Sequence, residues 1–296
     1  MIEILEATTW EQLQQLCADE EVRHNSINAL ESGKVVYLPH FSFQLESSES
    51  ALLSAEVTPK KNVKNISYNP DSQCLKALEE TNPHWATMKN FLHRYSTFSQ
   101  SLLLQLFPQY ESHLIMARTS FRPVEIAGRQ APSYRKDDTR LHVDAFPSSP
   151  NQGRRLLRVF SNVNPHGKPR TWRLGDSFEN VAKHFQSQLK SSPSFYRHAL
   201  KHLKITKGLR TDYDELMLNL HDTMKGDLAY QRAVSQQTVD LAAGGTWIVY
   251  TDQASHAATA GQFCCEQTFM LPVESMQDPA KSPLKILERV WQRKLV

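Results

Sequence analysis

Apolar positions along the first forty residues follow the spacing of two short helices and then that of a strand. Thr9 is a suitable N-cap for a helix whose apolar side begins at Trp10, and a second helix ends near Gly33. The apolar, β-branched run over 34–39 then predicts a strand. The chain is therefore expected to begin with two helices followed by a strand.

A long amphipathic helix is predicted over about 84–107, where apolar residues recur every three or four positions. Pro108 ends this pattern, because proline lacks the N–H that a continuing helix needs. Residues 57–73, which precede the helix, are rich in Lys, Asn and Pro and are typical of a surface loop. These patterns define an N-terminal helical region over about 1–110.

The spacing changes to short runs with a period of two beyond this region. Six strands are predicted, over 114–124, 139–145, 154–163, 170–174, 246–251 and 262–272. Helical spacing returns between the fourth and the fifth of them, from about 178 to 237. An insertion that interrupts the strands cannot be separated as an independent unit.

We therefore expect one domain over 1–296, mainly β with flanking helices, in the α+β class. Its core would be a double-stranded β-helix, the jelly roll of cupin-like proteins, formed by strands over about 113–175 and 244–273. The N-terminal helices and a helical insertion over about 177–237 would buttress this core.

Composition places the chain among folded proteins without a membrane span. Of the 296 residues, 40% are apolar and 22% are charged, which excludes a disordered or fibrous chain. No apolar run approaches the roughly 18 residues that cross a bilayer, and the acidic N-terminus is unlike a signal peptide. Four scattered cysteines form neither a disulfide scaffold nor a zinc knuckle, which favours the cytoplasm.

Charge is nearly balanced overall but is locally basic. A net charge of +3 does not favour nucleic acid as a partner, and none is expected. Two stretches, 197–210 and 281–296, are rich in Lys and Arg. Each is either a solvated helix face or a surface that meets an anionic membrane.

His142 and Asp144 are the candidate metal ligands, since residues two apart in a strand point the same way. With a second histidine they would form the two-His-one-carboxylate triad of non-haem Fe(II) oxygenases, which leaves positions open for O₂ and a cosubstrate. His256, just past the strand predicted over 246–251, is the expected distal ligand. His-x-Asp alone arises by chance, but its place in a jelly-roll pattern makes it informative. We predict that these three residues are both metal ligands and catalytic residues.

Arg158 is the candidate anchor for 2-oxoglutarate, the cosubstrate of many such enzymes. The distal carboxylate of 2-oxoglutarate needs a basic partner. The usual place, about ten residues beyond the distal histidine, contains no Lys or Arg over 262–269. Arg158 lies in an apolar predicted strand, and Asn162 shares its face as a further cofactor contact. A structural role for Arg158, paired with Glu266, is the alternative.

Other polar residues are weaker candidates. Arg118 or Arg173 would be the next candidate anchor after Arg158. His221 and Asp222 lie on a helical pattern and are interpreted as a cap or surface pair rather than as catalytic residues. Cys264 and Cys265, adjacent in a strand, face opposite ways and are interpreted as packing residues.

Long stretches of the chain resemble the 3-deoxy-D-manno-oct-2-ulosonic acid (Kdo) hydroxylases, a family of Fe(II)/2-oxoglutarate dioxygenases. The resemblance covers most of the sequence and is far more specific than His-x-Asp. It rests on GKVVY over 33–37, KNISY over 64–68, RTSFRPVEIAGR over 118–129, RKDDTRLHVDAFP over 135–147, LRVFSNVNP over 157–165 and SPL over 282–284. None of the three metal positions departs from the family.

The resemblance implies hydroxylation at carbon 3 of the Kdo sugar of Kdo-lipid A, in the lipopolysaccharide inner core, with release of succinate and CO₂. The cofactors implied are Fe(II), 2-oxoglutarate and O₂, with ascorbate as reductant. Kdo carries a carboxylate and lipid A carries phosphates, so a pocket for them needs cations. The candidates are Arg118, Arg122, Arg129 and Arg140, unless half of the basic residues here pair with Glu125, Asp137 and Asp138.

A lipid-linked substrate also predicts where the protein works. We expect a cytoplasmic protein in peripheral contact with the cytoplasmic face of the inner membrane, through the basic helix near 201–210 or the C-terminal segment containing Ile286, Leu287, Val290 and Trp291.

Two other functions fit the same pattern. One is a 2-oxoglutarate oxygenase of a peptide or a free amino acid, and the other is a non-catalytic, cupin-like module that binds sugar. Iron-dependent formation of succinate from 2-oxoglutarate separates these two alternatives.

Overall fold

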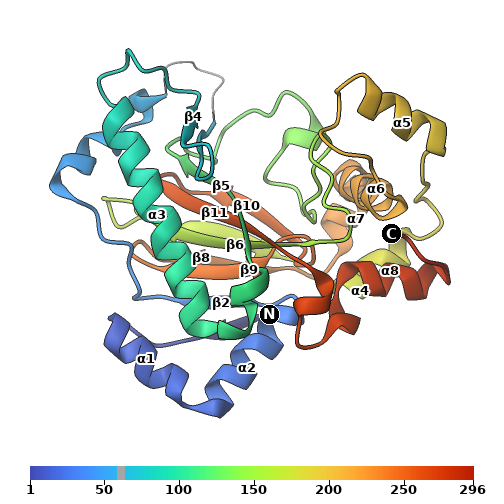
Figure 1. The fold of residues 1–296 in the computed structure, drawn as a ribbon, viewed down its shortest axis with the longest axis horizontal. Coiled ribbons are helices and arrows are strands. Elements are labelled where there is room, and N and C mark those ends of the chain that lie inside the picture. The colour runs from blue at the N-terminus through green and yellow to red at the C-terminus, as the bar shows by residue number, and fades with distance from the viewer. Residues whose placement is uncertain (59–63) are drawn as a thin grey trace.

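The computed structural model describes residues 1–58 and 64–296, and its strands form two sheets (Figure 1). The larger sheet has the order β1-β2-β9-β6-β11-β5-β3-β4, and the smaller has the order β10-β7-β8. The strands are β1 (Ile2–Ile4), β2 (Val35–Leu38), β3 (Ile66–Asn69), β4 (Cys74–Lys76), β5 (Ile115–Arg122), β6 (Arg155–Asn162), β7 (Arg170–Leu174), β8 (Gln237–Leu241), β9 (Thr246–Tyr250), β10 (His256–Ala260) and β11 (Cys264–Leu271). The β1–β2 pair is parallel and the other pairs of these strands are antiparallel.

Side chains of the two sheets meet in a closed apolar core, which confirms the predicted jelly roll. Phe160 of β6 and Trp247 of β9 stack at 5.2 Å between ring centroids, and Trp172 of β7 meets both edge-on. Leu157 and Val159, which alternate with Phe160, instead face a second core on the outer side of the larger sheet.

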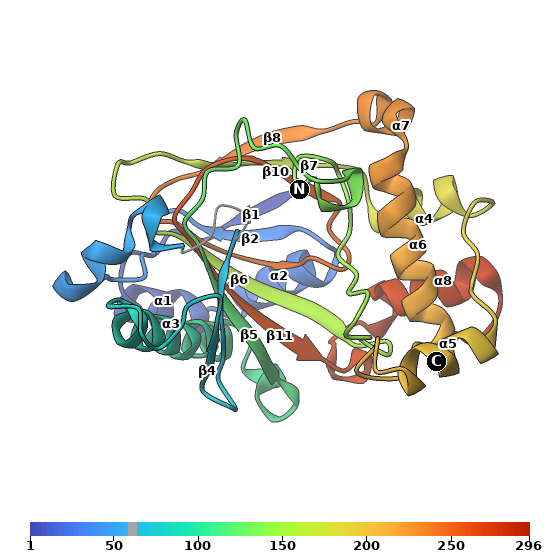
Figure 2. The ribbon, with the colours of Figure 1, turned by 90° about the horizontal axis from the view of Figure 1, so that it is seen from above.

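Helices cover that outer side, so the layers are helix, large sheet and small sheet (Figures 1 and 2). The helices are α1 (Trp10–Ala18), α2 (Glu20–Glu31), α3 (Trp85–Leu106), α4 (Phe178–Phe185), α5 (Ser194–His202), α6 (Asp212–Gly226), α7 (Leu228–Ala233) and α8 (Pro283–Trp291). As predicted, the Thr9 hydroxyl caps α1, and α3 ends just before Pro108. Helices α4 to α7 come between β7 and β8 along the chain, and they lie at one end of the two sheets.

Strands differ from the prediction in five places. The surface loop predicted over 57–73 contains β3, which forms a hairpin with β4, while residues 59–63 lie outside the described part of the chain. Strands β1, β8 and β10 were not predicted, and β1 precedes the two helices with which the chain was expected to begin. The segment over 139–145 is not a regular strand, since it pairs with its neighbour only through one bridge, His142 to His256.

Candidate metal centre

Backbone pairing brings His142, Asp144 and His256 together at one end of the barrel. The N–H groups of His142 and His256 each donate to the other residue's carbonyl, at 3.0 and 2.9 Å, and Asp144 N–H donates to Thr251 at 2.8 Å. These bonds hold the segment beside β10 with the two predicted ligands on one face. His256, expected just past a strand, is the first residue of β10.

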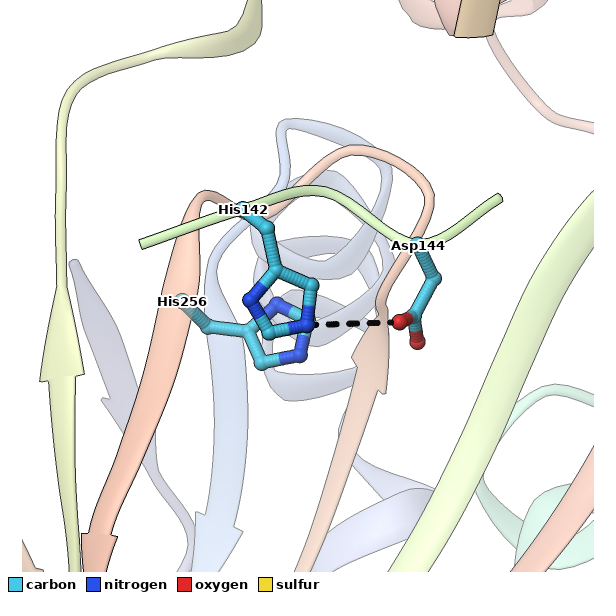
Figure 3. A group of neighbouring side chains, drawn as sticks. All are labelled: His142, Asp144 and His256. Carbon is cyan, nitrogen blue, oxygen red and sulfur yellow. Dashed lines mark ion pairs between the residues drawn. The ribbon is translucent and has the colours of Figure 1, made fainter. Parts of the chain in front are cut away.

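The three side chains converge as a metal site requires (Figure 3). One ligand atom from each lies within 4.8 Å of the others, and all three residues are buried or nearly so. His142 Nε2 is 3.6 Å from Asp144 Oδ1, and the two imidazole centroids are 4.7 Å apart.

Hydrogen bonds to the backbone fix both imidazoles in the tautomer that binds a metal through Nε2. Nδ1 of His142 lies 2.8 Å from the Arg140 carbonyl, and Nδ1 of His256 lies 2.8 Å from the Ala254 carbonyl. A carbonyl only accepts, so each Nδ1 carries the hydrogen and each Nε2 keeps its lone pair.

Burial keeps both rings neutral. It lowers the pKa of His142, and it lowers the pKa of His256 to about 4 with a contribution from the neighbouring His142. Burial alone would raise the pKa of Asp144, but Arg158, followed by the two histidines, holds it well below its usual value. Two neutral imidazoles and one carboxylate are the donor set that non-haem iron takes, so the residues present fit this metal.

Arg158 of β6 faces the metal centre and is already paired with two carboxylates. Its Nη1 lies 3.1 Å from Asp144 Oδ2 and 3.2 Å from Glu266 Oε1, while its Nε is buried without a hydrogen bond. The pairing with Glu266 that was the alternative to a cofactor role is therefore present.

Asn162 has a structural task that differs from the predicted cofactor contact. Its amide donates to the carbonyls of Lys168 and Leu241, both at 3.0 Å, and its Oδ1 accepts from Asn164 N–H at 3.1 Å. These bonds tie β6 to the following turn and to β8, and they occupy the amide group on both its donor and its acceptor side.

Arg170 of β7 is a buried cation that was not among the predicted site residues. It shares the inner face of β7 with Trp172 and Leu174, and it is 3% exposed. Nη1 makes a long bond of 3.3 Å to the Gly261 carbonyl, Nε has no partner, and no carboxylate within the described residues forms an ion pair with it. Burial lowers the pKa of this guanidinium, and the nearby Arg122 adds to the effect.

Gly261 lets the chain pass close to Arg170. Its φ is +107°, and a Cβ there would come within 2.9 Å of the Arg170 Cα. Any larger residue at Gly261 would therefore push Arg170 from its place. Alternation from Trp172 was the sequence signal for Arg170, since β7 was predicted over 170–174.

The four arginines that were predicted to bind the sugar differ in their ion pairs and in their exposure. Arg122 pairs with Glu266, Arg129 with Asp138, and Arg140 with Asp137 at 3.0 Å. Arg118 is exposed on the same face of β5 as Arg122. The alternative of pairing with nearby acids thus describes Arg129 and Arg140.

A jelly roll that joins His-x-Asp to a distal histidine between its sheets defines a non-haem, metal-dependent oxygenase. The sequence profile of the 3-deoxy-D-manno-oct-2-ulosonic acid (Kdo) hydroxylases matches residues 13–294, so the chain belongs to the Kdo hydroxylase family. This confirms the predicted family and enzyme class.

Solved structures agree with this membership. A crystal structure of the Kdo hydroxylase KdoO, a non-haem Fe(II) 2-oxoglutarate-dependent dioxygenase, contains 2-oxoglutarate and Fe(III). It is 47% identical, with 100% of this chain and 97% of that chain covered and a TM-score of 0.93. KdoO with cobalt(II) matches at the same identity and coverage with a TM-score of 0.94. No curated protein sequence matches the chain.

Proposed function

We propose that this protein hydroxylates carbon 3 of the Kdo sugar in a lipid-linked precursor of lipopolysaccharide, using Fe(II), 2-oxoglutarate and O₂. In the balanced reaction the sugar C–H, 2-oxoglutarate and O₂ give the sugar C–OH, succinate and CO₂. The arrangement of His142, Asp144 and His256, in which each imidazole bonds a carbonyl through Nδ1 and keeps the lone pair of Nε2 for a metal, carries the proposal within a chain of this family.

His142, Asp144 and His256 would hold the iron, whose chemistry is the activation of O₂ against the C–H bond. The residues need little rearrangement to do so. Their tautomers and charge are set by the Arg140 and Ala254 carbonyls and by burial, before any ligand arrives.

Local charge supports a binding place for the distal carboxylate of 2-oxoglutarate. Arg122, Arg158 and Arg170 reach the barrel interior, and Glu266 balances only one of them once Asp144 is given to the metal. Arg170 is the main anchor in this proposal, because it has no acidic partner among the described residues to give up. Arg158 is the second, through its unpaired Nε edge.

The sugar and its phosphates would meet the basic segment before His142. Residues 118–140 contain six cations and three acids, so the segment keeps a net positive charge after its internal pairs form. Arg118, which is exposed, is the best placed of the four predicted arginines for the Kdo carboxylate. Arg122, Arg129 and Arg140 contribute mainly to the field.

A lipid-linked substrate requires a surface that meets the membrane, and α5 with the turn after it fits this need. We define the α5 patch as residues 195–207. It exposes Phe195, Tyr196, Leu203 and Ile205, with fractions of 76, 46, 66 and 55%. Lys201, Lys204 and Lys207 are exposed in the same segment and form no ion pair with the described residues. Apolar side chains among lysines suit an anionic lipid surface.

The α5 patch contacts the loop that follows Asp144. Lys207 N–H donates to the Ser148 carbonyl at 2.9 Å, and the Arg210 guanidinium donates to the Pro147 carbonyl. A substrate whose acyl chains stay in the lipid would thus have its sugar near the barrel.

The C-terminal segment, the other predicted docking surface, is unsuited to this role. Ile286 and Leu287 of α8 are 6% and 0% exposed within the core, and Val290 and Trp291 pack against it. No helix in the described ranges is long and apolar enough to cross a membrane. Peripheral contact at the cytoplasmic face of the inner membrane therefore remains the proposal, through α5.

Mass spectrometry of the sugar product tests the proposed function. Purified protein is incubated with Fe(II), 2-oxoglutarate, ascorbate and a Kdo-linked lipid A precursor, and the hydroxylated sugar and succinate are both quantified. We expect a gain of one oxygen at carbon 3, in step with succinate. Efficient hydroxylation of an unrelated peptide or amino acid, with no product from the Kdo substrate, would contradict the substrate assignment.

A further inference from the structure

Phe146 follows the two ligands of the metal-binding segment at the same spacing that separates those ligands. His142 and Asp144 point to one side (Figure 3), while Val143 and Ala145 pack in the core on the outer side of the larger sheet. Because side chains alternate along this segment, Phe146 lies on the side of the metal ligands. It is half-buried and belongs to none of the apolar cores found among the described residues.

The ring of Phe146 lies over a cation that contacts the metal centre. Its centroid is 5.5 Å from Cζ of Arg158, whose Nη1 is 3.1 Å from Oδ2 of Asp144. The guanidinium and the carboxylate are charged, and the ring is an apolar surface beside them. The metal centre therefore has an apolar wall next to its carboxylate ligand.

Hydrogen bonds hold the backbone on both sides of Phe146. Asp144 N–H donates to the Thr251 carbonyl at 2.8 Å, and the Ser148 carbonyl accepts from Lys207 N–H at 2.9 Å. The ring is thus placed by the fold, and its position does not depend on a ligand.

The reacting carbon of a Kdo sugar is itself apolar. In a 3-deoxy sugar carbon 3 is a methylene group, whereas the carbons on either side of it carry oxygen. In the proposed reaction this methylene faces the metal. An apolar wall gains contact with a methylene, but it leaves a hydroxyl on the same carbon without a hydrogen-bond partner, which costs free energy. Substrate and product therefore differ in how well they fit beside such a wall.

We propose that Phe146 is a specificity-determining residue, whose ring packs against the carbon 3 methylene of Kdo and disfavours the hydroxylated product. The sugar would contact the part of the ring that Arg158 leaves uncovered. The inference rests on the proposed function, since it states how that site distinguishes its substrate from its product. Weaker binding of the product lets it leave, so that the next substrate can bind.

Direct binding measurements test this role without turnover. The Kdo-linked lipid A precursor and its hydroxylated product, prepared with the wild-type protein, are each titrated into iron-loaded protein that contains 2-oxoglutarate, in the absence of O₂. The variants are Phe146→Leu, which keeps an apolar side chain, and Phe146→Asn, whose amide can bond to a hydroxyl. Bound iron and the Kd for 2-oxoglutarate are measured for each.

Phe98→Leu is the matched control. Phe98 is also a half-buried phenylalanine, but it belongs to α3, on the outer side of the larger sheet, where it stacks on Phe41 at 5.9 Å between ring centroids. This variant removes an aromatic ring of the same exposure class without touching the metal centre.

We expect the wild type to bind the precursor about 10- to 100-fold more tightly than the product, the range over which an apolar pocket rejects an added hydroxyl. Phe146→Asn should bring this ratio close to one, because the product hydroxyl gains a partner and the methylene loses its apolar contact. Phe146→Leu and Phe98→Leu should keep most of the ratio. Bound iron and the Kd for 2-oxoglutarate should stay near those of the wild type in all three variants.

Two kinds of result would overturn the inference. Equal binding of precursor and product by the wild type, or a wild-type ratio in Phe146→Asn, would show that the ring does not distinguish them. Loss of iron or of 2-oxoglutarate binding in both Phe146 variants would show that the ring supports the contact between Arg158 and Asp144 instead. Absence of a hydroxylated Kdo product from the wild type would refute the proposed function itself, and with it this inference.

Discussion

Nη1 of Arg158 lies 3.1 Å from Oδ2 of Asp144, so a cation of the large sheet touches the carboxylate ligand of the metal centre. The same Nη1 is 3.2 Å from Glu266 of the next strand. This link keeps Asp144 ionised in a buried place where a lone carboxylate would take up a proton. A residue of the large sheet thereby keeps Asp144 ionised, although this metal ligand belongs to the loop beside the small sheet.

Loss of any one metal ligand is expected to abolish turnover. His256→Ala should reduce iron from about one ion per chain to a small fraction, because two remaining donors hold the ion poorly. Bound metal after gel filtration and succinate formation are the measurements. A variant that kept wild-type iron and 2-oxoglutarate consumption would show that the distal ligand is assigned wrongly.

Arg170→Met is expected to weaken 2-oxoglutarate binding by about 10- to 100-fold, the usual effect of losing a charge-assisted contact. Arg158→Lys should have a smaller effect, since the charge beside Glu266 is kept. Anaerobic calorimetry of the iron-loaded protein measures both. Arg118→Met is the control, which should leave 2-oxoglutarate binding unchanged and raise the sugar KM. The reverse order, with Arg158→Lys the weaker binder, would make Arg158 the anchor.

The buried pair of Arg155 and Asp252 is expected to matter for folding rather than for chemistry. Both side chains are fully buried, with Nε to Oδ2 at 2.8 Å. Asp252→Asn leaves the guanidinium without its counter-charge and should lower the free energy of unfolding by about 3–5 kcal/mol. Glu179→Gln removes the exposed partner of Lys183 and should change it by less than about 0.5 kcal/mol. Equal effects in urea unfolding would contradict this contrast.

Binding to lipid is expected to depend on both kinds of side chain in the α5 patch. Replacing Lys201, Lys204 and Lys207 by Gln should weaken binding to vesicles that contain phosphatidylglycerol on the order of a hundredfold, at about 1 kcal/mol per lysine. Phe195→Ser with Leu203→Ser should weaken it as well. Co-sedimentation at low and high salt measures the effect, with pure phosphatidylcholine vesicles as the control. Salt-independent binding, or unchanged binding by the lysine variant, would exclude this surface.

The spacing of apolar residues was sufficient to predict those helices and strands whose conformation is determined by their own residues. Helix α3 and strand β7 follow directly from apolar periodicity. Strand β10 has the sequence HAATA, and it is a strand because β7 and His142 pair with it. Only Ile66 and Tyr68 are buried in β3, which is too short a signal within a polar stretch.

The same contrast applies to the candidate site, where local sequence predicts some residues and tertiary packing places the others. His142 and Asp144 are visible in the sequence because two ligands lie two residues apart. Arg170 was not predicted, because its burial follows only from its place on the same face of β7 as Trp172. The place of His221 of α6, whose ring lies 5.3 Å from that of His142, could not be predicted from sequence, because it depends on how α6 packs against residues 135–141.

Gln231 of α7 determines how accurately the segment with His142 and Asp144 is placed in the metal centre. Its amide accepts from Leu141 N–H at 2.8 Å and donates to the Leu141 carbonyl at 2.9 Å, as a neighbouring strand would. The segment that carries His142 and Asp144 is thus hydrogen-bonded to β10 on one edge and to the side chain of Gln231 on the other. A slip of one residue would turn His142 and Asp144 out of the barrel. Gln231 therefore fixes the register of this segment. It also occupies the backbone edge to which a strand of another chain could otherwise pair.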